Sequence, residues 1–354
     1  MKNTVGNISL LLLLTCGSCS STYQFSVDIQ EPAAVTLPVS AQNVLILDNT
    51  IVQPENNGME RTYNGQSIHE NYPLYLDSMV WSAIDEMAIV LNESNFFKTI
   101  AIYQKPLRTD TEWLAETILS PEEQADFYNT ENYDALLVID RLLFSVKENV
   151  KKIQDVSFSY EPSAFVDLRT DGLITCSMYA FGKDKPLTTF TVSDSLFLKS
   201  MVANDSTILF KVLPEYLLDE LSRVIGNQAA THFIPTWKTT ERMFFTGYNS
   251  RMQEAVGYAA DKQWLKAESV WASELENKTK PADKAKIAFN LAVTNEMQDK
   301  FDEALEWAQK AKDYLQSANP NKDSKEIDLT NEYISLLKQR IQSNRLLDLQ
   351  WGKE

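Results

Sequence analysis

The amino-acid sequence predicts a multidomain α+β protein, with an N-terminal mixed α/β sheet domain followed by an all-α helical repeat domain. The chain of 354 residues has room for two domains that each bury a core, and its hydrophobic share of 44% is ordinary for globular proteins. Apolar runs typical of strands alternate with an amphipathic helix in the first part. A helical motif that occurs twice fills the second part.

Four segments follow from this organisation. We expect a signal peptide over residues 1–18, a tether over 19–42, the mixed α/β domain over 43–240 and the helical domain over 241–354.

The first segment reads as an export signal. Lys2 precedes an apolar run from Ile8 to Leu14, and small residues follow around Cys16 and Cys19. The run is too short to span a bilayer, and the whole pattern is typical of a secretory signal peptide. The cysteine after Ser18 resembles the end of a bacterial lipoprotein signal, which implies cleavage there and attachment of lipid to Cys19. Cys16 stands where such signals carry an aliphatic residue, and an ordinary cleaved signal peptide is the alternative.

The resemblance also implies a location in the cell envelope. In lipoproteins of the Bacteroidota type, an acidic cluster after the lipidated cysteine tends to mark surface export, and here Ser20 to Tyr23 carry no acid. We therefore expect a lipid anchor in the outer membrane that faces the periplasm. The net charge of −16 disfavours nucleic acid and anionic bilayers, so we expect contact with the membrane through the lipid alone and no nucleic-acid partner.

The sheet domain is expected to begin with a buried strand over residues 43–48 and a helix whose apolar residues recur from Leu76 to Leu91. A second strand over 96–103 and two short helices over 110–130, with Ser120-Pro121-Glu122-Glu123 as a cap, come next. A central strand starts near 132; its first half, to Asp140, is apolar throughout, and its second half alternates through Val146. Further elements are predicted as strands at 156–168, 173–181 and 187–193, an Asp171-Gly172 hairpin turn and a helix over 206–231. This order resembles a small α/β domain of envelope lipoproteins, among them the curli-secretion and penicillin-binding-protein-activator types.

Signals for chemistry are scarce. Phosphate-binding, nucleophile-elbow and zinc-protease motifs do not occur, and the two histidines, His69 and His232, lie far apart. Cys176 reads as a buried apolar residue, and Asp140-Arg141 reads as a surface ion pair at the end of the central strand. We therefore predict no enzyme activity, no catalytic residue, no metal site and no cofactor. A carbohydrate hydrolase that uses two of the 49 acidic residues is a distant alternative.

The second half repeats itself. Ala255 and Ala292 lie 37 residues apart, and so do Ala267 and Ala304. Small residues at these positions let the two helices of a hairpin approach closely, and the pattern resembles tetratricopeptide repeats at 249–276 and 283–316, with a capping helix at 325–349.

In such repeats the first helix of each hairpin lines a concave face. The resemblance implies a protein-binding groove lined by Met252, Val256, Ala259, Lys286, Phe289, Val293 and Glu296. A plain helical bundle without a groove is the alternative.

The arrangement as a whole resembles Bacteroidota lipoproteins of unknown function, through the stretches Trp264–Ala267 and Ala304–Ala308. We predict a non-enzymatic, lipid-anchored cell-envelope protein that binds a protein partner through the helical domain. The alternative is a self-assembling structural or secretion-associated envelope lipoprotein.

Overall fold

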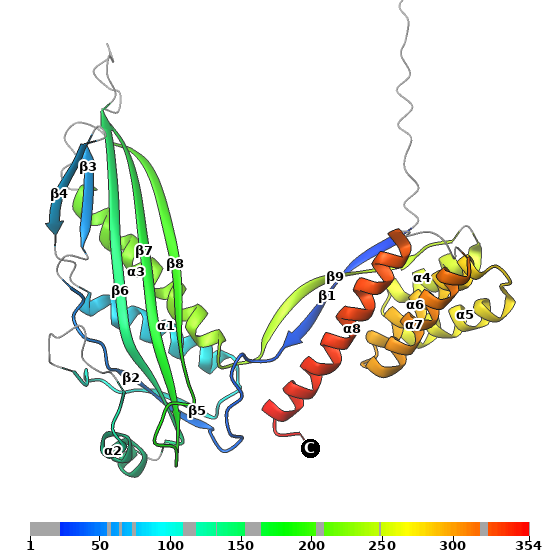
Figure 1. The fold of residues 1–354 in the computed structure, drawn as a ribbon, viewed down its shortest axis with the longest axis horizontal. Helices are drawn as coiled ribbons and strands as arrows, with labels where there is room; N and C mark the ends of the chain where they lie inside the picture. Colours follow the sequence, from blue (N-terminus) through cyan, green and yellow to red (C-terminus); the bar gives the residue numbers. More distant parts are fainter. Residues whose placement is uncertain are drawn as a thin grey trace, which may run out of the picture. The chain divides into compact units, whose positions relative to one another are not determined.

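The computed structural model describes residues 22–54, 58–63, 66–72, 76–108, 118–131, 133–152, 164–202, 209–247, 249–318 and 325–353. The described chain forms two compact units (Figure 1). The sheet unit contains residues 30–237 and 343–353, and the helical unit contains residues 22–29 and 238–342. The predicted α+β class is confirmed, with the sheet in the N-terminal part and most helices in the C-terminal part.

A seven-stranded mixed sheet organises the sheet unit, and β6 is its longest strand. The first half of β6 pairs in parallel with β2, its second half pairs in parallel with β3, and its whole length pairs antiparallel with β7. The outer strands are β5 beside β2, β4 beside β3, and β8 beside β7. The strands are β2 (Asn43–Asp48), β3 (Met59–Tyr63), β4 (Gln66–Tyr72), β5 (Thr99–Ile102), β6 (Ala135–Lys152), β7 (Ala164–Ala180) and β8 (Thr188–Val202).

Helices cover both faces of the sheet. Helices α1 (Asp77–Glu93) and α3 (Leu209–Thr231) pack on one face, where alternate strand residues such as Ile46 and Leu137 join their apolar side chains in the main core. Helix α2 (Pro121–Glu131) packs on the other face, against Leu47 and Val138. The predicted cap of α2 is confirmed, because Ser120 and Glu123 exchange side-chain to backbone hydrogen bonds of 2.7 and 3.2 Å.

One predicted turn is wrong. Asp171 and Gly172 lie inside the continuous strand β7, which runs from Ala164 to Ala180. A Cβ atom on Gly172 would lie 2.8 Å from the Phe144 ring and 2.9 Å from a methyl carbon of Leu221. This glycine therefore lets α3 approach the sheet closely, and a glycine with that function carries the same sequence signature as a turn.

The helical unit starts with a two-stranded ribbon. β1 (Thr22–Glu31) pairs with β9 (Thr236–Phe245), although residues 19–42 were predicted to be a tether. Side chains also bridge the two strands, since Thr239 donates to Asp28 over 2.6 Å and Ser26 donates to Glu241 over 2.8 Å. More than 200 residues of sequence separate these strands, so no local sequence pattern predicts that they pair.

Five helices complete the described part of the helical unit, with ends within a few residues of the ranges that the repeat predicted. The helices are α4 (Ser250–Ala260), α5 (Trp264–Asn277), α6 (Pro281–Glu296), α7 (Phe301–Ala318) and α8 (Lys325–Gln350). The alanines at the close helix contacts are fully buried, as the hairpin pattern requires.

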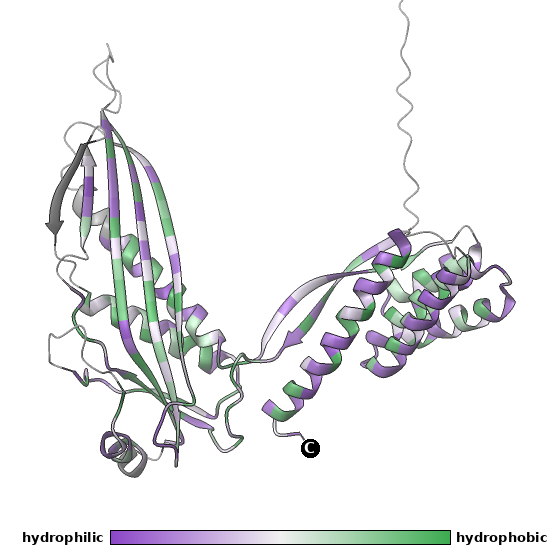
Figure 2. Ribbon diagram, viewed as in Figure 1, coloured by the Kyte–Doolittle hydropathy of each residue, from purple (hydrophilic) through white to green (hydrophobic). Residues whose placement is uncertain are grey.

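The last turns of α8 belong to the sheet unit, where Gln350 holds the backbone of Ala33 with hydrogen bonds of 2.9 and 3.0 Å. Along α8 the residue colours alternate between hydrophilic and hydrophobic (Figure 2). Within the residues that the structure describes, no helix combines the length and the apolar character needed to span a membrane.

Candidate functional site

The sheet unit has a pocket of about 470 Å³ where the parallel strands β2 and β5 end. After β2 the chain forms β3 and β4 of the same sheet before it reaches α1, and after β5 it continues to α2. Ligand sites of open α/β sheets lie at the carboxyl ends of parallel strands.

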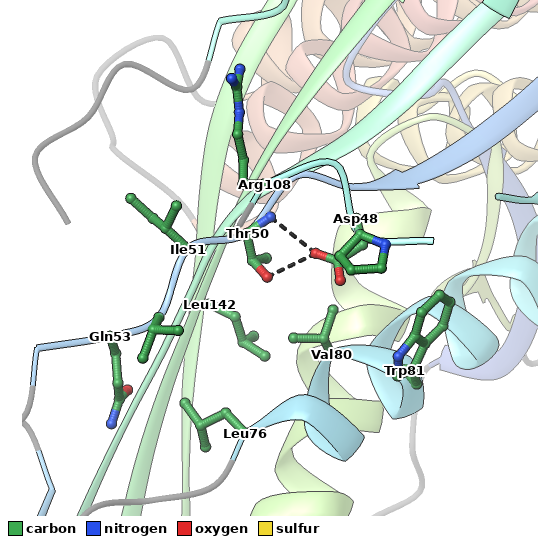
Figure 3. Close-up of a pocket in the computed structure, with 11 residues that line it drawn as sticks. Asp48, Thr50, Ile51, Gln53, Leu76, Val80, Trp81, Arg108 and Leu142 are labelled. Carbon is green, nitrogen blue, oxygen red and sulfur yellow. Dashed lines mark hydrogen bonds between the residues drawn. The ribbon is translucent and has the colours of Figure 1, made fainter. Parts of the chain in front are cut away.

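The pocket is partly polar and partly apolar (Figure 3). Asp48, at the end of β2, accepts hydrogen bonds from the backbone N–H and the hydroxyl of Thr50, at 2.9 and 2.7 Å. Trp81 and Val80 contribute the apolar wall from α1, and Leu142 contributes the floor from β6. The carboxylate is therefore held in place by its own turn, beside a surface suited to an apolar group.

Behind the pocket a chain of hydrogen bonds leads to a buried carboxyl. Arg108 donates to the Asn49 side chain over 2.8 Å, and Asn49 donates to Asp140 over 3.2 Å. Ser177 donates to the other oxygen of Asp140. Asp140 is only 3% exposed, so the prediction that it forms a surface ion pair is wrong. Burial raises the pKa of this carboxyl above its ordinary value, while the Ser177 and Asn49 hydrogen bonds act in the opposite direction.

The described side chains around the pocket include few groups for chemistry. Asp48 is the only carboxylate among the described residues that line it, whereas glycosidases use two facing carboxyl groups. Across the described ranges, His, Cys, Asp and Glu side chains form no group of three that could hold a metal ion. Cys176 is buried, which raises the pKa of its thiol, and the ring of His232 stacks on Phe190 at 4.2 Å. Cys19, the predicted lipidation site, lies outside the described residues.

The residues predicted to line an open groove are mostly packed inside the helical unit. Five are buried and two are half-buried, so the prediction of an open groove at these positions does not match the packing. The buried ones are Met252, Ala259, Phe289, Val293 and Glu296, and the half-buried ones are Val256 and Lys286. The reason lies in β9 and α8, because the Phe289 ring packs 5.2 Å from that of Phe245 on β9 and 5.0 Å from that of Tyr333 on α8.

Glu296 is the centre of a buried charge network. Its two carboxylate oxygens accept hydrogen bonds of 2.8 and 2.7 Å from the guanidinium of Arg242 on β9. The Tyr333 hydroxyl donates to it over 2.8 Å, and Arg340 lies 3.7 Å away. This network joins β9, α6 and α8, so Glu296 acts in the structure and not in a groove.

A free sheet edge was not foreseen from the sequence. In the described part of the sheet, β8 pairs with β7 alone, and their register runs without a shift from Met178–Thr188 to Ala164–Val202. The other side of β8 therefore presents backbone groups that no described strand pairs with, although the Ser195 N–H donates to the Asp194 side chain over 2.7 Å. Phe197 on this strand is 66% exposed. The alternation of Val192, Asp194, Leu196 and Leu198 with polar residues or Phe197 could have extended the strand predicted at 187–193, but no sequence pattern shows which strand ends a sheet.

Comparisons with known proteins identify a family. The family described as Domain of unknown function (DUF8603) matches residues 41–245, more than half of the chain, and the chain belongs to it. A second family, Domain of unknown function (DUF6340), matches residues 253–339 in the helical unit. No curated protein sequence matches the chain.

Solved structures show only distant similarity. The minor lipoprotein of Acinetobacter baumannii is 10% identical with a TM-score of 0.22, and the match covers 51% of this chain and 97% of the lipoprotein chain. Rare lipoprotein B of Shewanella oneidensis is 11% identical with a TM-score of 0.20, covering 49% and 88%. A neuraminyllactose-binding hemagglutinin homolog of Helicobacter pylori is 14% identical with a TM-score of 0.20, covering 57% and 83%. Scores this low carry no conclusion about function.

Proposed function

We propose that this chain is a non-enzymatic, lipid-anchored protein of the cell envelope that binds other protein chains, and that the free edge of β8 is the binding surface. The single observation that carries the proposal is this edge, which no strand among the described residues covers over the 15 residues of β8. An extended segment can add to such an edge, where backbone hydrogen bonds supply affinity and alternate side chains supply specificity.

The sequence of β8 supports this use of the edge. Folded proteins usually protect an open edge with proline, a bulge or several charges. β8 has no proline, its register with β7 has no shift, and Lys199 is its only basic residue. Threonine, valine and phenylalanine, which favour strands, make up much of it. An edge of this length and composition favours pairing with another chain.

The tetratricopeptide-like helices are not the binding surface in this proposal, in contrast to the expectation from the sequence. The inner face of α4 and α6 is filled by β9 and α8, so the proposal moves partner binding from the helical groove to the sheet edge. The lipid anchor at Cys19 and the periplasmic face of the outer membrane are part of the proposal and rest on the sequence pattern alone.

A site-specific photo-crosslinker tests the binding surface in cells. The photoreactive residue is placed at Phe197 on β8, or at Phe165, an exposed control position on β7 that faces the same side of the sheet. We expect protein adducts from position 197 and few from 165. Ser195→Pro removes the Ser195 N–H, which donates to the Asp194 side chain in the single chain, and places a proline ring where a pairing strand would lie, so it should abolish the adducts. An adduct pattern that Ser195→Pro leaves unchanged would contradict the proposal.

The anchor is tested separately. Cys19→Ala should release the chain from the membrane fraction, whereas Cys16→Ala should not. If Cys16→Ala releases the chain instead, the choice of the lipidated cysteine is wrong.

A further inference from the structure

We infer that the chain that pairs with the β8 edge is a second copy of this protein, and that the two β8 strands run antiparallel about a two-fold axis at Phe197. This inference rests on the proposed use of the β8 edge. It goes further by naming the occupant, the direction of the strands and their register.

The backbone groups available at the edge can be assigned. Phe181 donates its N–H to the Asp134 carbonyl, which continues the ladder between β6 and β7. Because hydrogen bonding alternates along an antiparallel strand, odd-numbered residues of β7 bond to β6 and even-numbered residues bond to β8. The register pairs even with even, as in Met178 with Thr188. The odd-numbered residues of β8 therefore direct their N–H and C=O groups to the free edge. The Ser195 N–H donates to the Asp194 side chain there and would exchange this bond for one to the second copy.

Those same residues place the most exposed apolar side chain of the strand at the edge. Phe197 is odd-numbered, so its backbone groups and those of the second copy's Phe197 would form a hydrogen-bonded pair on the axis. The two rings would then lie opposite each other on the face of the sheet that carries α2, where aromatic cross-strand pairs stabilise an antiparallel ladder. On the other face, Leu196 would lie opposite Leu198 of the second copy. Both leucines already pack against the core, so the pairing extends the core across the axis.

Charges on the strand agree with this register. Lys199 would lie opposite Ser195 of the second copy, and Asp194 would lie opposite Ser200, so no like charges face each other. An axis at Asp194 would set two carboxylates opposite each other, and an axis at Lys199 would set two ammonium groups opposite each other, which destabilises a sheet. An axis at Ser195 avoids this repulsion but places Phe197 opposite Ser193. The axis at Phe197 is therefore the register with the best pairing of side chains.

Sedimentation velocity tests the occupant. The protein is the full chain with Cys16→Ser and Cys19→Ser, which is expected to be free of lipid, measured over a range of concentrations. We expect a monomer–dimer equilibrium. Phe197→Ser should weaken it about tenfold or more, in keeping with roughly 1.4 kcal/mol for loss of an aromatic pair. Phe165→Ser, on the same face but inside the sheet, should leave it unchanged.

A short bismaleimide crosslinker tests direction and register in the same protein, where Cys176 is buried. With the axis at Phe197, the Ser195→Cys positions of the two copies lie about 14 Å apart, whereas the Thr189→Cys positions lie about 54 Å apart. A linker that reaches about 15 Å should therefore join the first pair and not the second. Equal joining of both pairs would overturn the antiparallel register.

The outcomes separate the inference from the proposed function. A chain that stays monomeric at all concentrations, while its adducts at Phe197 in cells contain a different protein, overturns the second copy and leaves the β8 edge as the binding surface. A monomeric chain without any adduct at Phe197 overturns both.

Discussion

Replacing Glu296 by glutamine should destabilise the helical unit strongly, because it removes one charge from a buried network and keeps the side-chain shape. The Glu296 side chain is fully buried and the Arg242 side chain is 3% exposed. Glu296 accepts two hydrogen bonds from Arg242 and one from Tyr333. Removing one partner of a buried ion pair leaves the other charge without compensation, which costs about 3–5 kcal/mol.

The matched control is Glu254→Gln. Glu254 forms an exposed ion pair with Arg251 at 3.5 Å, and such pairs contribute about 0–1 kcal/mol. Hydrogen exchange of the α6 amides measures the opening free energy of the helical unit separately from that of the sheet unit. We expect Glu296→Gln to lower this free energy by several kcal/mol and Glu254→Gln to leave it nearly unchanged. A loss below about 1 kcal/mol for Glu296→Gln would refute the account of the network.

Three further predictions concern the sheet unit and helix α4. Because burial raises the pKa of the Asp140 carboxyl, the stability that this group contributes is present below its ordinary pKa of 3.8 and is lost as pH rises through the raised value. Denaturation curves should therefore show that the free energy of unfolding of Asp140→Asn increases relative to that of the native protein as pH increases above about 4. A difference between the two free energies that does not change with pH would contradict this. Gly226→Ala should lower the melting temperature, because its Cβ would lie 2.6 Å from the Ala83 carbonyl oxygen, whereas Gly257→Ala has open space and should add about 1 kcal/mol of helix stability. Cys176 should resist maleimide in the native state and react after unfolding, since burial raises the pKa of its thiol; rapid native labelling would show that β7 opens.

Elements with a local signal could be predicted from the sequence. The helix expected from Leu76 to Leu91 is α1, and the central strand expected near 132 is β6, because apolar periodicity reports directly which face is buried. The cap at Ser120 was also predictable, because all its partners lie within one turn of the helix.

Features set by distant partners could not be predicted. The pairing of β1 with β9 and the bond from Asn49 to Asp140 depend on residues that meet only in the fold. The groove prediction failed because the repeat pattern describes α4 to α7 alone, whereas β9 and α8 fill the inner face. The free edge of β8 is also a property of the sheet, since strand order depends on all the pairings together.

Amide hydrogen exchange along β8 tests the central claim most directly. At low concentration Thr191, Ser193, Phe197 and Lys199 should exchange fast, and the even-numbered residues, which bond to β7, should exchange slowly. Ser195 is left out of this comparison because its N–H donates to the Asp194 side chain. As concentration rises, protection should appear at the odd-numbered residues, and Ser195→Pro should prevent it. Exchange at the odd-numbered residues that is fast at every concentration would contradict a second copy at the edge, and slow exchange in the dilute monomer would contradict the free edge itself.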